Sequence, residues 1–204
     1  DEDQTVYYPQ IGTTATDQLT GTHQGFAREN AEIRDEVAYQ GLKAGQEYTL
    51  DGVLMDKATG EPYLVDGQEV TVTKSFIPEN SDGTVVLEFA FDGSSLKDVS
   101  LVVFETLYTG DTEVGSHKDL GDEGQTVDYP EHHLDTSAKD KATGTNTGTP
   151  AKSVTIIDTV TYNGLIPGQE YTLKGVLMDK ATGEPYLVNG QPVTVERTLV
   201  PEKG

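Results

Sequence analysis

The chain has 204 residues, enough for one large domain or two small ones. Its formal net charge of -21 argues against nucleic-acid binding, which requires a basic surface, and the absence of cysteine excludes disulfides. No apolar run approaches the length that spans a membrane. The acidic composition suits an exported bacterial surface protein, and it fits ordinary solubility equally well.

A repeat with an offset of 123 residues, from position 53 to position 176, organises the chain. Residues 53–65, V-L-M-D-K-A-T-G-E-P-Y-L-V, recur unchanged at 176–188. The block contains a predicted hairpin turn, D-K-A-T-G-E-P at 56–62, in which Gly60 is free to adopt a positive φ. The same offset relates further pairs outside the block: Thr13 to Thr136, Asp35 to Asp158, and Pro78-Glu79 to Pro201-Glu202.

A second match indicates where one repeat ends. Residues 122–130, D-E-G-Q-T-V-D-Y-P, are nearly identical to D-E-D-Q-T-V-Y-Y-P at 1–9. Because the chain starts with what resembles the end of a repeat, we predict a piece of a tandem array. The expected segments are the C-terminal strand of a preceding repeat at 1–9, a complete sandwich domain at 10–131, and the incomplete N-terminal part of the next repeat at 132–204.

Short apolar clusters bounded by turn residues predict β-strands within each repeat. The hydrophobic fraction is low, at 34%, and 22 Gly and 9 Pro favour many short strands joined by loops. Val85, Leu87 and Phe89 alternate with outward-facing residues such as Glu88, as in a strand buried on one face. The sequence therefore predicts an all-β fold of tandem immunoglobulin-like β-sandwich domains. In chain order, the strands expected in the complete repeat are 11–16, 32–38, 47–55, 69–76, 84–91, 100–108 and 125–129.

Two acidic side chains interrupt apolar strands. Glu105 follows the apolar run 101–104, and Asp35 lies between Ile33 and Val37. Acids within strands usually lie at a sheet edge or beside a loop, so neither residue alone indicates chemistry. If both are buried close together, however, they cannot easily both ionise and should share one proton.

The last predicted strand begins with Gln125, and His117 and Asp122 precede it. A His before a loop is usually solvated, and a Gln in a strand usually faces water. Asp119, Asp122 and Glu123 offer carboxylates for calcium, but their spacing does not match the twelve-residue calcium loop. We therefore predict no metal site and no other cofactor.

Taken together, these patterns resemble a known family. The segments that carry the resemblance are I-R-D-E-V-A-Y-Q-G-L at 33–42, Y-T-L-D-G-V-L-M-D-K at 48–57, V-V-F-E at 102–105, and H-K-D at 117–119 followed after five residues by Q-T. They are similar to the repeats of Gram-positive surface adhesins that carry intramolecular Thr–Gln ester bonds, the VaFE type of immunoglobulin-like repeat. The resemblance covers the whole complete repeat and the available part of the next.

In that family a Thr on an early strand attacks the side-chain amide of a Gln on the last strand, and ammonia leaves. A His and nearby acids assist, and the reaction occurs once per molecule. The resemblance therefore implies single-turnover cross-linking and no true enzyme activity. The residues that match are Thr13 and Gln125 for the cross-link, His117, Asp35 and Glu105 for catalysis, and Asp122 as a supporting acid.

The nucleophile has a neighbouring rival in Thr14. In the second repeat the position of Thr14 is occupied by Ser137, whereas Thr13 matches Thr136. Thr13 lies on the first strand, which in sandwiches of this kind can run beside the last. We therefore predict that Thr13 is the nucleophile.

The residue types fit the chemistry. A neutral His117 can take the proton of a threonine hydroxyl, and Asp122 can hold the imidazole in the required tautomer. A proton shared by Asp35 and Glu105 would let one of them donate to the oxyanion that develops on Gln125. The sequence does not decide which acid keeps the proton.

The incomplete repeats contain only parts of this set. Thr136 and Asp158 match Thr13 and Asp35, but no matching Glu, His or Gln follows them, and Gln4 lacks the His that should precede it. We expect neither partial site to be cross-linked within this polypeptide.

The predicted function is a stalk segment of a surface adhesin or pilus-like protein, extracellular and anchored to the cell wall of a Gram-positive bacterium. Its expected partners are neighbouring repeats in the same chain and, through other domains, a host surface ligand, without nucleic acid or membrane insertion. One alternative is a sandwich closed by a Lys–Asn isopeptide bond, although residues 125–129 contain no Asn. Another is a hydrolase-like enzyme that uses His117 with Asp35 and Glu105.

Overall fold

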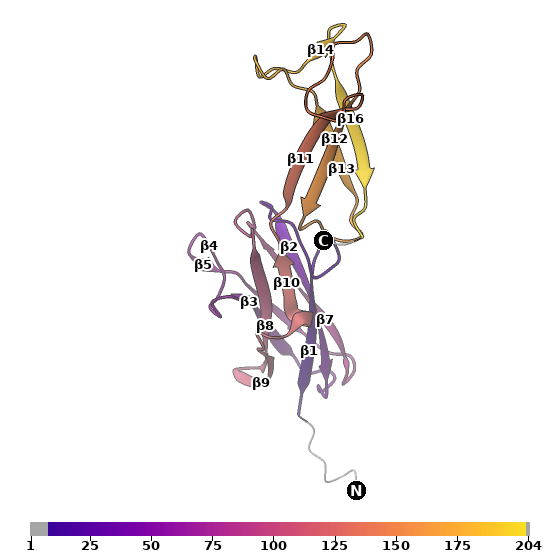
Figure 1. Ribbon diagram of the computed structural model, residues 1–204. Helices are drawn as coiled ribbons and strands as arrows, with labels where there is room; N and C mark the ends of the chain where they lie inside the picture. Colours follow the sequence, from indigo (N-terminus) through magenta and orange to yellow (C-terminus); the bar gives the residue numbers. More distant parts are fainter. Residues whose placement is uncertain (1–7, 203–204) are drawn as a thin grey trace. The chain divides into compact units, whose positions relative to one another are not determined.

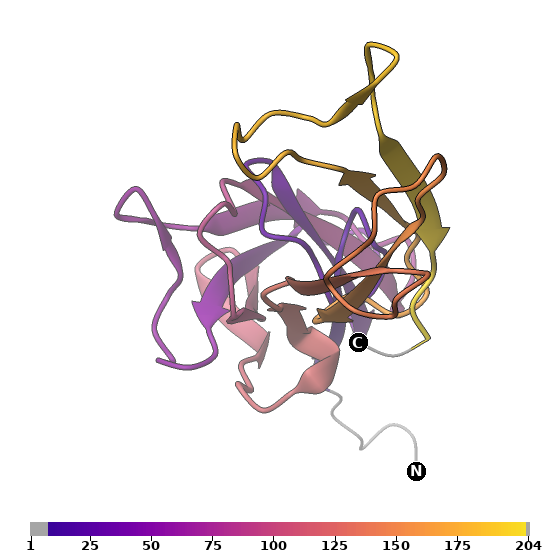
Figure 2. The same cartoon turned by 45° about the horizontal axis from the view of Figure 1, so that its top comes forward.

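The computed structural model describes residues 8–202, and the chain divides into two compact units, Asp1–Glu131 and His132–Gly204 (Figure 1). Both units are built from β-strands, and in both a short hairpin projects from the body, β4–β5 in the first and β14–β15 in the second (Figures 1 and 2). Over the described residues no helix is long and apolar enough to cross a membrane.

The first unit forms two sheets that pack face to face. One sheet has the order β1-β2-β7, and the other has the order β10-β8-β3-β6, with β9 also paired to β8. Val85, Leu87 and Phe89 are buried in the core between the sheets, whereas Glu88 is exposed, as the alternation predicted. The all-β sandwich prediction is therefore confirmed. The strands are β1 Gln10–Asp17, β2 Ala31–Gln40, β3 Tyr48–Asp56, β4 Leu64–Val65, β5 Gln68–Glu69, β6 Thr71–Phe76, β7 Gly83–Phe91, β8 Val99–Thr109, β9 Thr112–His117 and β10 Thr126–Tyr129.

Strand β8 carries two partners end to end along one edge. Its first half pairs with β10, from Val99 to Val102, and its second half pairs with β9, from Glu105 to Thr109. Val103 and Phe104 therefore face a break between the two partner strands. Strand β9 was not expected from the sequence, and it places His117 at a strand end, paired with Glu105, instead of in a loop.

Gln125 does not start the last strand, as the sequence had suggested. It ends a short 3₁₀ helix, η2 (Glu123–Gln125), and β10 begins one residue later. Asp122 caps this helix because its Oδ1 accepts a hydrogen bond from the backbone N–H of Gly124 at 2.7 Å. The helix turns Gln125 back towards the break in the β8 edge.

Strands β1 and β10 lie against each other but belong to different sheets, so no backbone ladder joins them. Near their starts, Thr13 and Gln125 both contact Glu105. At their ends, Asp17 and Tyr129 lie side by side, because both come within 2.6 Å of the position a Cβ would take on Gly25. The two strands therefore run in the same direction along one edge of the sandwich.

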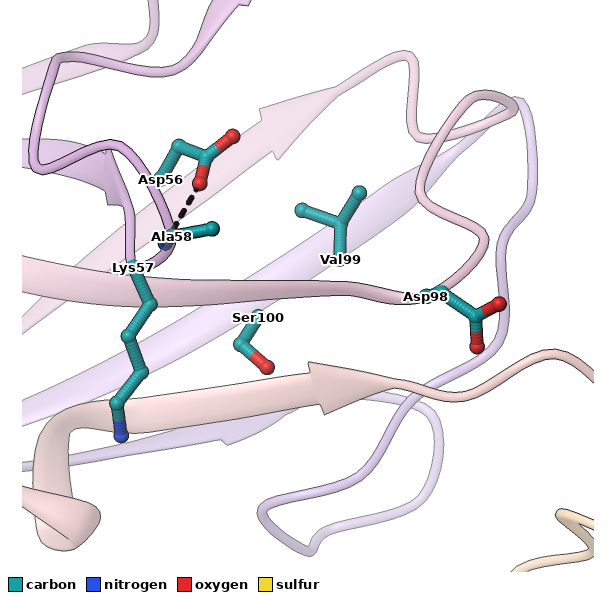
Figure 3. A pocket seen from close by; sticks show the side chains of 6 residues that line it. All are labelled: Asp56, Lys57, Ala58, Asp98, Val99 and Ser100. Atoms are coloured by element: carbon teal, nitrogen blue, oxygen red, sulfur yellow. Dashed lines mark hydrogen bonds between the residues drawn. The ribbon is translucent and has the colours of Figure 1, made fainter.

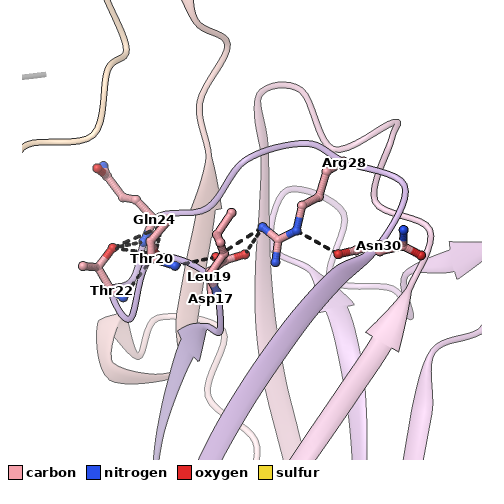
Figure 4. A network of polar contacts seen from close by, with 7 residues as sticks. All are labelled: Asp17, Leu19, Thr20, Thr22, Gln24, Arg28 and Asn30. Carbon is pink, nitrogen blue, oxygen red and sulfur yellow. Dashed lines mark hydrogen bonds and ion pairs between the residues drawn. The ribbon is translucent and has the colours of Figure 1, made fainter. Parts of the chain in front are cut away.

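The connection between β1 and β2 holds the end of β10. Asp17 is fully buried, pairs with Arg28 at 3.0 Å, and accepts hydrogen bonds from the backbone N–H groups of Leu19 and Thr20 (Figure 4). The same connection bonds to Asp128 on β10, which donates to His23 O and accepts from Gly25 N. Both edges of β10 are thus paired.

We predict that Gly25→Ala lowers the free energy of unfolding of the first unit by about 2–3 kcal/mol. The added Cβ would lie 2.5 Å from Tyr129 Cε1 and 2.6 Å from Asp17 Oδ2, so the buried ion pair must move. Urea denaturation measures the effect. Gly12→Ala is the matched control, since nothing lies within 4 Å of its new Cβ. Equal stabilities of the two variants would contradict the prediction.

The second unit repeats the first six strands of the first at the sequence offset, since β1 begins at residue 10 and β11 at residue 133. Strand β11 pairs with β12, β13 with β16, and β14 with β15. Apolar side chains such as Leu134, Ile157 and Val195 are about half exposed. The strands are β11 His133–Asp140, β12 Ile156–Asn163, β13 Tyr171–Val176, β14 Leu187–Val188, β15 Gln191–Pro192 and β16 Thr194–Leu199.

Candidate cross-linking site between the first and last strands

Glu105 is the centre of the candidate site. It lies on β8, and its side chain is fully buried. In the sheet register Glu105 stands between Gly52 on β3 and His117 on β9. Its Oε1 accepts a hydrogen bond from Thr13 Oγ1 at 3.4 Å, and its Oε2 accepts one from Gln125 Nε2 at 2.7 Å. One carboxyl group thus bridges the expected nucleophile and the expected electrophile.

Thr13 and Thr14 face opposite sides of β1. Thr13 shares its face with Ala15 and Asp17, which are both fully buried, and it points into the sandwich. Thr14 is exposed. Only Thr13 of the two rivals therefore lies at the site.

The Gln125 side chain fills the break in the β8 edge. It is fully buried, and its Nε2 donates to Val103 O at 2.7 Å as well as to Glu105. The carbonyl of Val103 can only accept, which fixes the amide with nitrogen towards β8. The amide oxygen Oε1 is buried and has no hydrogen-bond partner among the described residues. The Val103 contact was not predicted, because a backbone carbonyl leaves no signal in the residue types.

Asp35 reaches the same place from the opposite sheet. It lies on β2 opposite Ala15, and it is fully buried. Burial raises the pKa of Asp35, and burial followed by the charge of Asp35 raises the pKa of Glu105 further. Two buried carboxyl groups that interact cannot easily both ionise, so the pair favours one shared proton, and the larger rise in pKa favours Glu105 as its holder.

His117 and Asp122 form the outer part of the site. His117 Nε2 lies 3.1 Å from Asp122 Oδ2, and the other ring nitrogen, Nδ1, is buried with no partner within residues 8–202. A proton on Nε2 that is donated to Asp122 leaves Nδ1 with its lone pair. In the described part of the chain no hydrogen bond joins His117 to Thr13; the hydroxyl of Thr13 contacts Glu105 instead.

The partial site of the second unit lacks this enclosure. In the second unit Thr136 lies opposite Val160 and Asp158 lies opposite Ala138, which is the register of Thr13 and Asp35 in the first unit. Thr136 and Asp158 are nevertheless exposed. Gln4 lies outside the described residues.

A pocket of about 230 Å³ lies beside the turn after β3 (Figure 3). Its lining includes Asp56, Lys57 and Ser100 but none of the predicted site residues. Within residues 8–202, no group of three or more His, Asp or Glu side chains is arranged to hold a metal ion.

Comparison with known proteins identifies both units. The model of a family described as "T-Q ester bond containing domain" matches residues 9–129 and again 132–204. A bacterial adhesin from Mobiluncus mulieris, whose structure contains intramolecular disulfide, isopeptide and ester bond cross-links, has a similar fold. In each of two crystal forms the TM-score is 0.53 at 13% identity, over 93% of this chain and 93% of that chain.

A weaker likeness involves a putative β-galactosidase from Bacteroides fragilis. Its TM-score is 0.40 at 15% identity, over 53% of this chain and 16% of that chain, and it carries no argument about activity. No curated protein matches the sequence.

Proposed function

Because the chain belongs to the family of T-Q ester bond containing domains, we propose that its first unit closes an ester between Thr13 and Gln125. The observation that carries this proposal is the position of Glu105, whose two carboxyl oxygens contact the Thr13 hydroxyl and the Gln125 amide nitrogen. Folding itself supplies the proximity that the reaction needs.

The proposed reaction is an acyl transfer within one chain. Thr13 Oγ1 attacks Cδ of Gln125, the O–H proton of Thr13 leaves, and the negative charge that develops rests on Gln125 Oε1. The intermediate then collapses with cleavage of the Cδ–Nε2 bond. The nitrogen takes up one proton and departs as ammonia, so the chain loses about 17 Da and gains one ester.

The acid pair balances the proton transfers. Asp35, which is ionised, takes the proton of Thr13, while Glu105 gives its proton to the nitrogen that it already contacts. The pair holds one proton before the reaction and one after it. This differs from the role expected from the sequence, in which one acid donates to the amide oxygen, because the contact of Glu105 is with the nitrogen.

We assign His117 a supporting role in place of the base that the sequence suggested, because among the described residues the Thr13 hydroxyl contacts Glu105 and not the imidazole. Asp122 holds the ring through the 3.1 Å contact with Nε2. His117→Gln tests this assignment, since glutamine keeps a donor for Asp122 but has no ring nitrogen that can take a proton. Loss of closure in His117→Gln, with the fold intact, would restore the base role.

The mass of the denatured protein tests the proposal directly. We expect the wild type to lie about 17 Da below the mass calculated from its sequence, and Thr13→Ala to have its calculated mass. Thr14→Ala is the matched control, because its side chain is exposed, and it should still lose ammonia. Hydroxylamine should open the bond. An unmodified wild-type mass would contradict the proposal.

For the whole protein, the proposed role is a structural segment of a bacterial surface adhesin or pilus-like stalk, outside the cell and attached to a Gram-positive cell wall. Two supports are the repetition of one domain type along the chain and the net charge of -21, which keeps such a surface solvated. The ester would replace the disulfides that the chain lacks. By analogy with a disulfide that closes a loop of this length, it would stabilise the unit by about 4–5 kcal/mol.

A further inference from the structure

We infer that Lys57 is a positioning residue for the cross-linking reaction, because its ammonium group holds the turn that presents Gln125. The inference rests on the proposed function. Lys57 Nζ donates to Thr126 Oγ1 at 2.9 Å, and Thr126 Oγ1 donates to Asp122 O at 2.7 Å. The same Asp122 oxygen accepts the backbone N–H of Gln125 at 3.3 Å. Lys57 therefore fixes both ends of η2 through one hydroxyl.

Lys57 reaches this point from the end of a strand, β3, that is not paired with β10. It belongs to the turn after β3, and in the sheet order β8 lies between β3 and β10. The backbone N–H of Lys57 donates to Ser100 O on β8, and the side chain then crosses β8 towards the start of β10 (Figure 3). Lys57 thus ties the turn that carries Gln125 to the strand that carries Glu105.

A second contact links the same two segments. Gly60, in the turn of Lys57, has a φ of 72° and lies against the loop before η2, where a Cβ on Gly60 would come 3.2 Å from Leu120 Cδ1. That loop also contains Asp122, which holds His117. The turn at 56–61 therefore supports the whole segment from His117 to Thr126.

The contact of Lys57 with Thr126 is not needed to form the turn. In the first unit the turn closes through Asp56 N to Glu61 O and Gly60 N to Asp56 O, both at 2.8–2.9 Å. In the second unit the identical D-K-A-T-G sequence closes through the matching bonds of Asp179, Glu184 and Gly183. That turn forms without a strand equivalent to β10 among the described residues of its unit. The contact to Thr126 is therefore a separate feature that serves η2.

Positioning of a reacting group within about 1 Å can change a rate by up to about a hundredfold. Loss of one of several bonds that hold η2 should have a smaller effect. We expect Lys57→Met, which keeps the apolar stem, to slow ester closure about tenfold. Lys57→Arg keeps a donor and should stay within about threefold of the wild type. Lys180→Met, the same change in the second unit, is the matched control and should close at the wild-type rate.

The rate can be followed on the full chain made by cell-free translation, with samples quenched in acid at intervals and the loss of about 17 Da read by mass spectrometry. Thr126→Val removes the hydroxyl that Lys57 binds, and the double variant Lys57→Met/Thr126→Val should be no slower than Thr126→Val alone. The pH profile should keep its wild-type shape, since the change alters the placement of Gln125 and not a titrating group.

The outcomes separate the two proposals. If the wild type does not lose ammonia, the proposed function fails. If the wild type closes and Lys57→Met closes equally fast, only the role of Lys57 fails. The role of Lys57 also fails if the effects of Lys57→Met and Thr126→Val on the rate of ester closure multiply in the double variant. Thr13→Ala, which cannot close the ester, shows the effect of Lys57→Met on folding alone. The role also fails if Lys57→Met in this background lowers the melting temperature so far that the first unit is unfolded in the assay, and Lys57→Arg does not restore ester closure.

Discussion

Pulled from its two ends, the first unit of Thr13→Ala should unfold with a lengthening of roughly 370–400 Å that the wild type does not show. This length corresponds to the 111 residues from 14 to 124, fully extended. In the wild type an ester would join the two ends of this stretch, so the stretch would remain outside the path of the force. The measurement is single-molecule force spectroscopy on the full chain, in which the second unit contributes equally to both proteins.

The direction of the strands explains why the effect should be so complete. Strands β1 and β10 run in the same direction, so force that enters before Thr13 and leaves after Tyr129 shears one strand past the other. The ester would lie at the starts of both strands. Force would then pass from the first residues of β1 through the ester and along β10 to Pro130. Only these few residues would carry load.

Thr14→Ala is the control for this measurement, because it removes a neighbouring hydroxyl that faces solvent. It should extend like the wild type. Treatment of the wild type with hydroxylamine should give the long extension of Thr13→Ala without any change of sequence. Equal extensions of the wild type and Thr13→Ala would contradict a mechanical role for the bond, even if the mass shows that the bond forms.

Much of the fold follows from patterns that local physics enforces. The alternation of Val85, Leu87 and Phe89 placed these residues in the core because successive side chains of a strand face opposite sides. Asp35 and Glu105 interrupt apolar strands in the sequence, and the structure buries both completely. The apolar runs identified both acids as unusual, but an acid within a strand more often lies at a sheet edge, so only the resemblance to the family implied that the two share a site.

The break in the β8 edge was not foreseeable. Strand β9, T-E-V-G-S-H, has one large apolar residue, Val114, and its strand character comes from pairing with β8. The T-V-D-Y segment that follows Gln125 made the whole stretch look like one strand. The preceding D-E-G, with Asp122 as a helix cap, was the available signal for η2. The location of the proton in the acid pair depends on burial and on neighbouring charge, which only the assembled sandwich determines.

The final prediction is that Glu105→Gln abolishes the cross-link and yet makes the uncross-linked fold more stable at neutral pH. Glutamine keeps the shape of a protonated glutamate and can still accept a hydrogen bond from Gln125 Nε2. It has no proton to give to the departing nitrogen. The intact mass should therefore remain at the calculated value, as in Thr13→Ala.

The stability gain follows from the direction of the pKa shift. Burial, and then the charge of Asp35, raise the pKa of Glu105 in the folded state, so the folded state retains a proton that the unfolded state releases above its ordinary pKa of about 4.5. Stability is therefore fullest below that pH and falls as the pH rises, by about 1.4 kcal/mol per unit, until the folded pKa is reached. Glu105→Gln, placed in the Thr13→Ala background, removes this dependence. We expect it to add about 2–3 kcal/mol at pH 7 and almost nothing at pH 4.

Urea denaturation of Thr13→Ala with and without Glu105→Gln, at several pH values, measures the difference. Glu88→Gln is the matched control, since Glu88 lies on β7 with its side chain exposed, and its effect should be small at every pH. If the stability difference caused by Glu105→Gln stays constant with pH, Glu105 is ionised in the folded state. In that case the proton for the departing ammonia must come from another group, and His117 beside Glu105 on β9 is the nearest alternative in the sheet register. Glu105 therefore lowers the stability of the fold at neutral pH while supplying the proton that the reaction needs. This trade of stability for reactivity is expected where a buried acid is retained for chemistry.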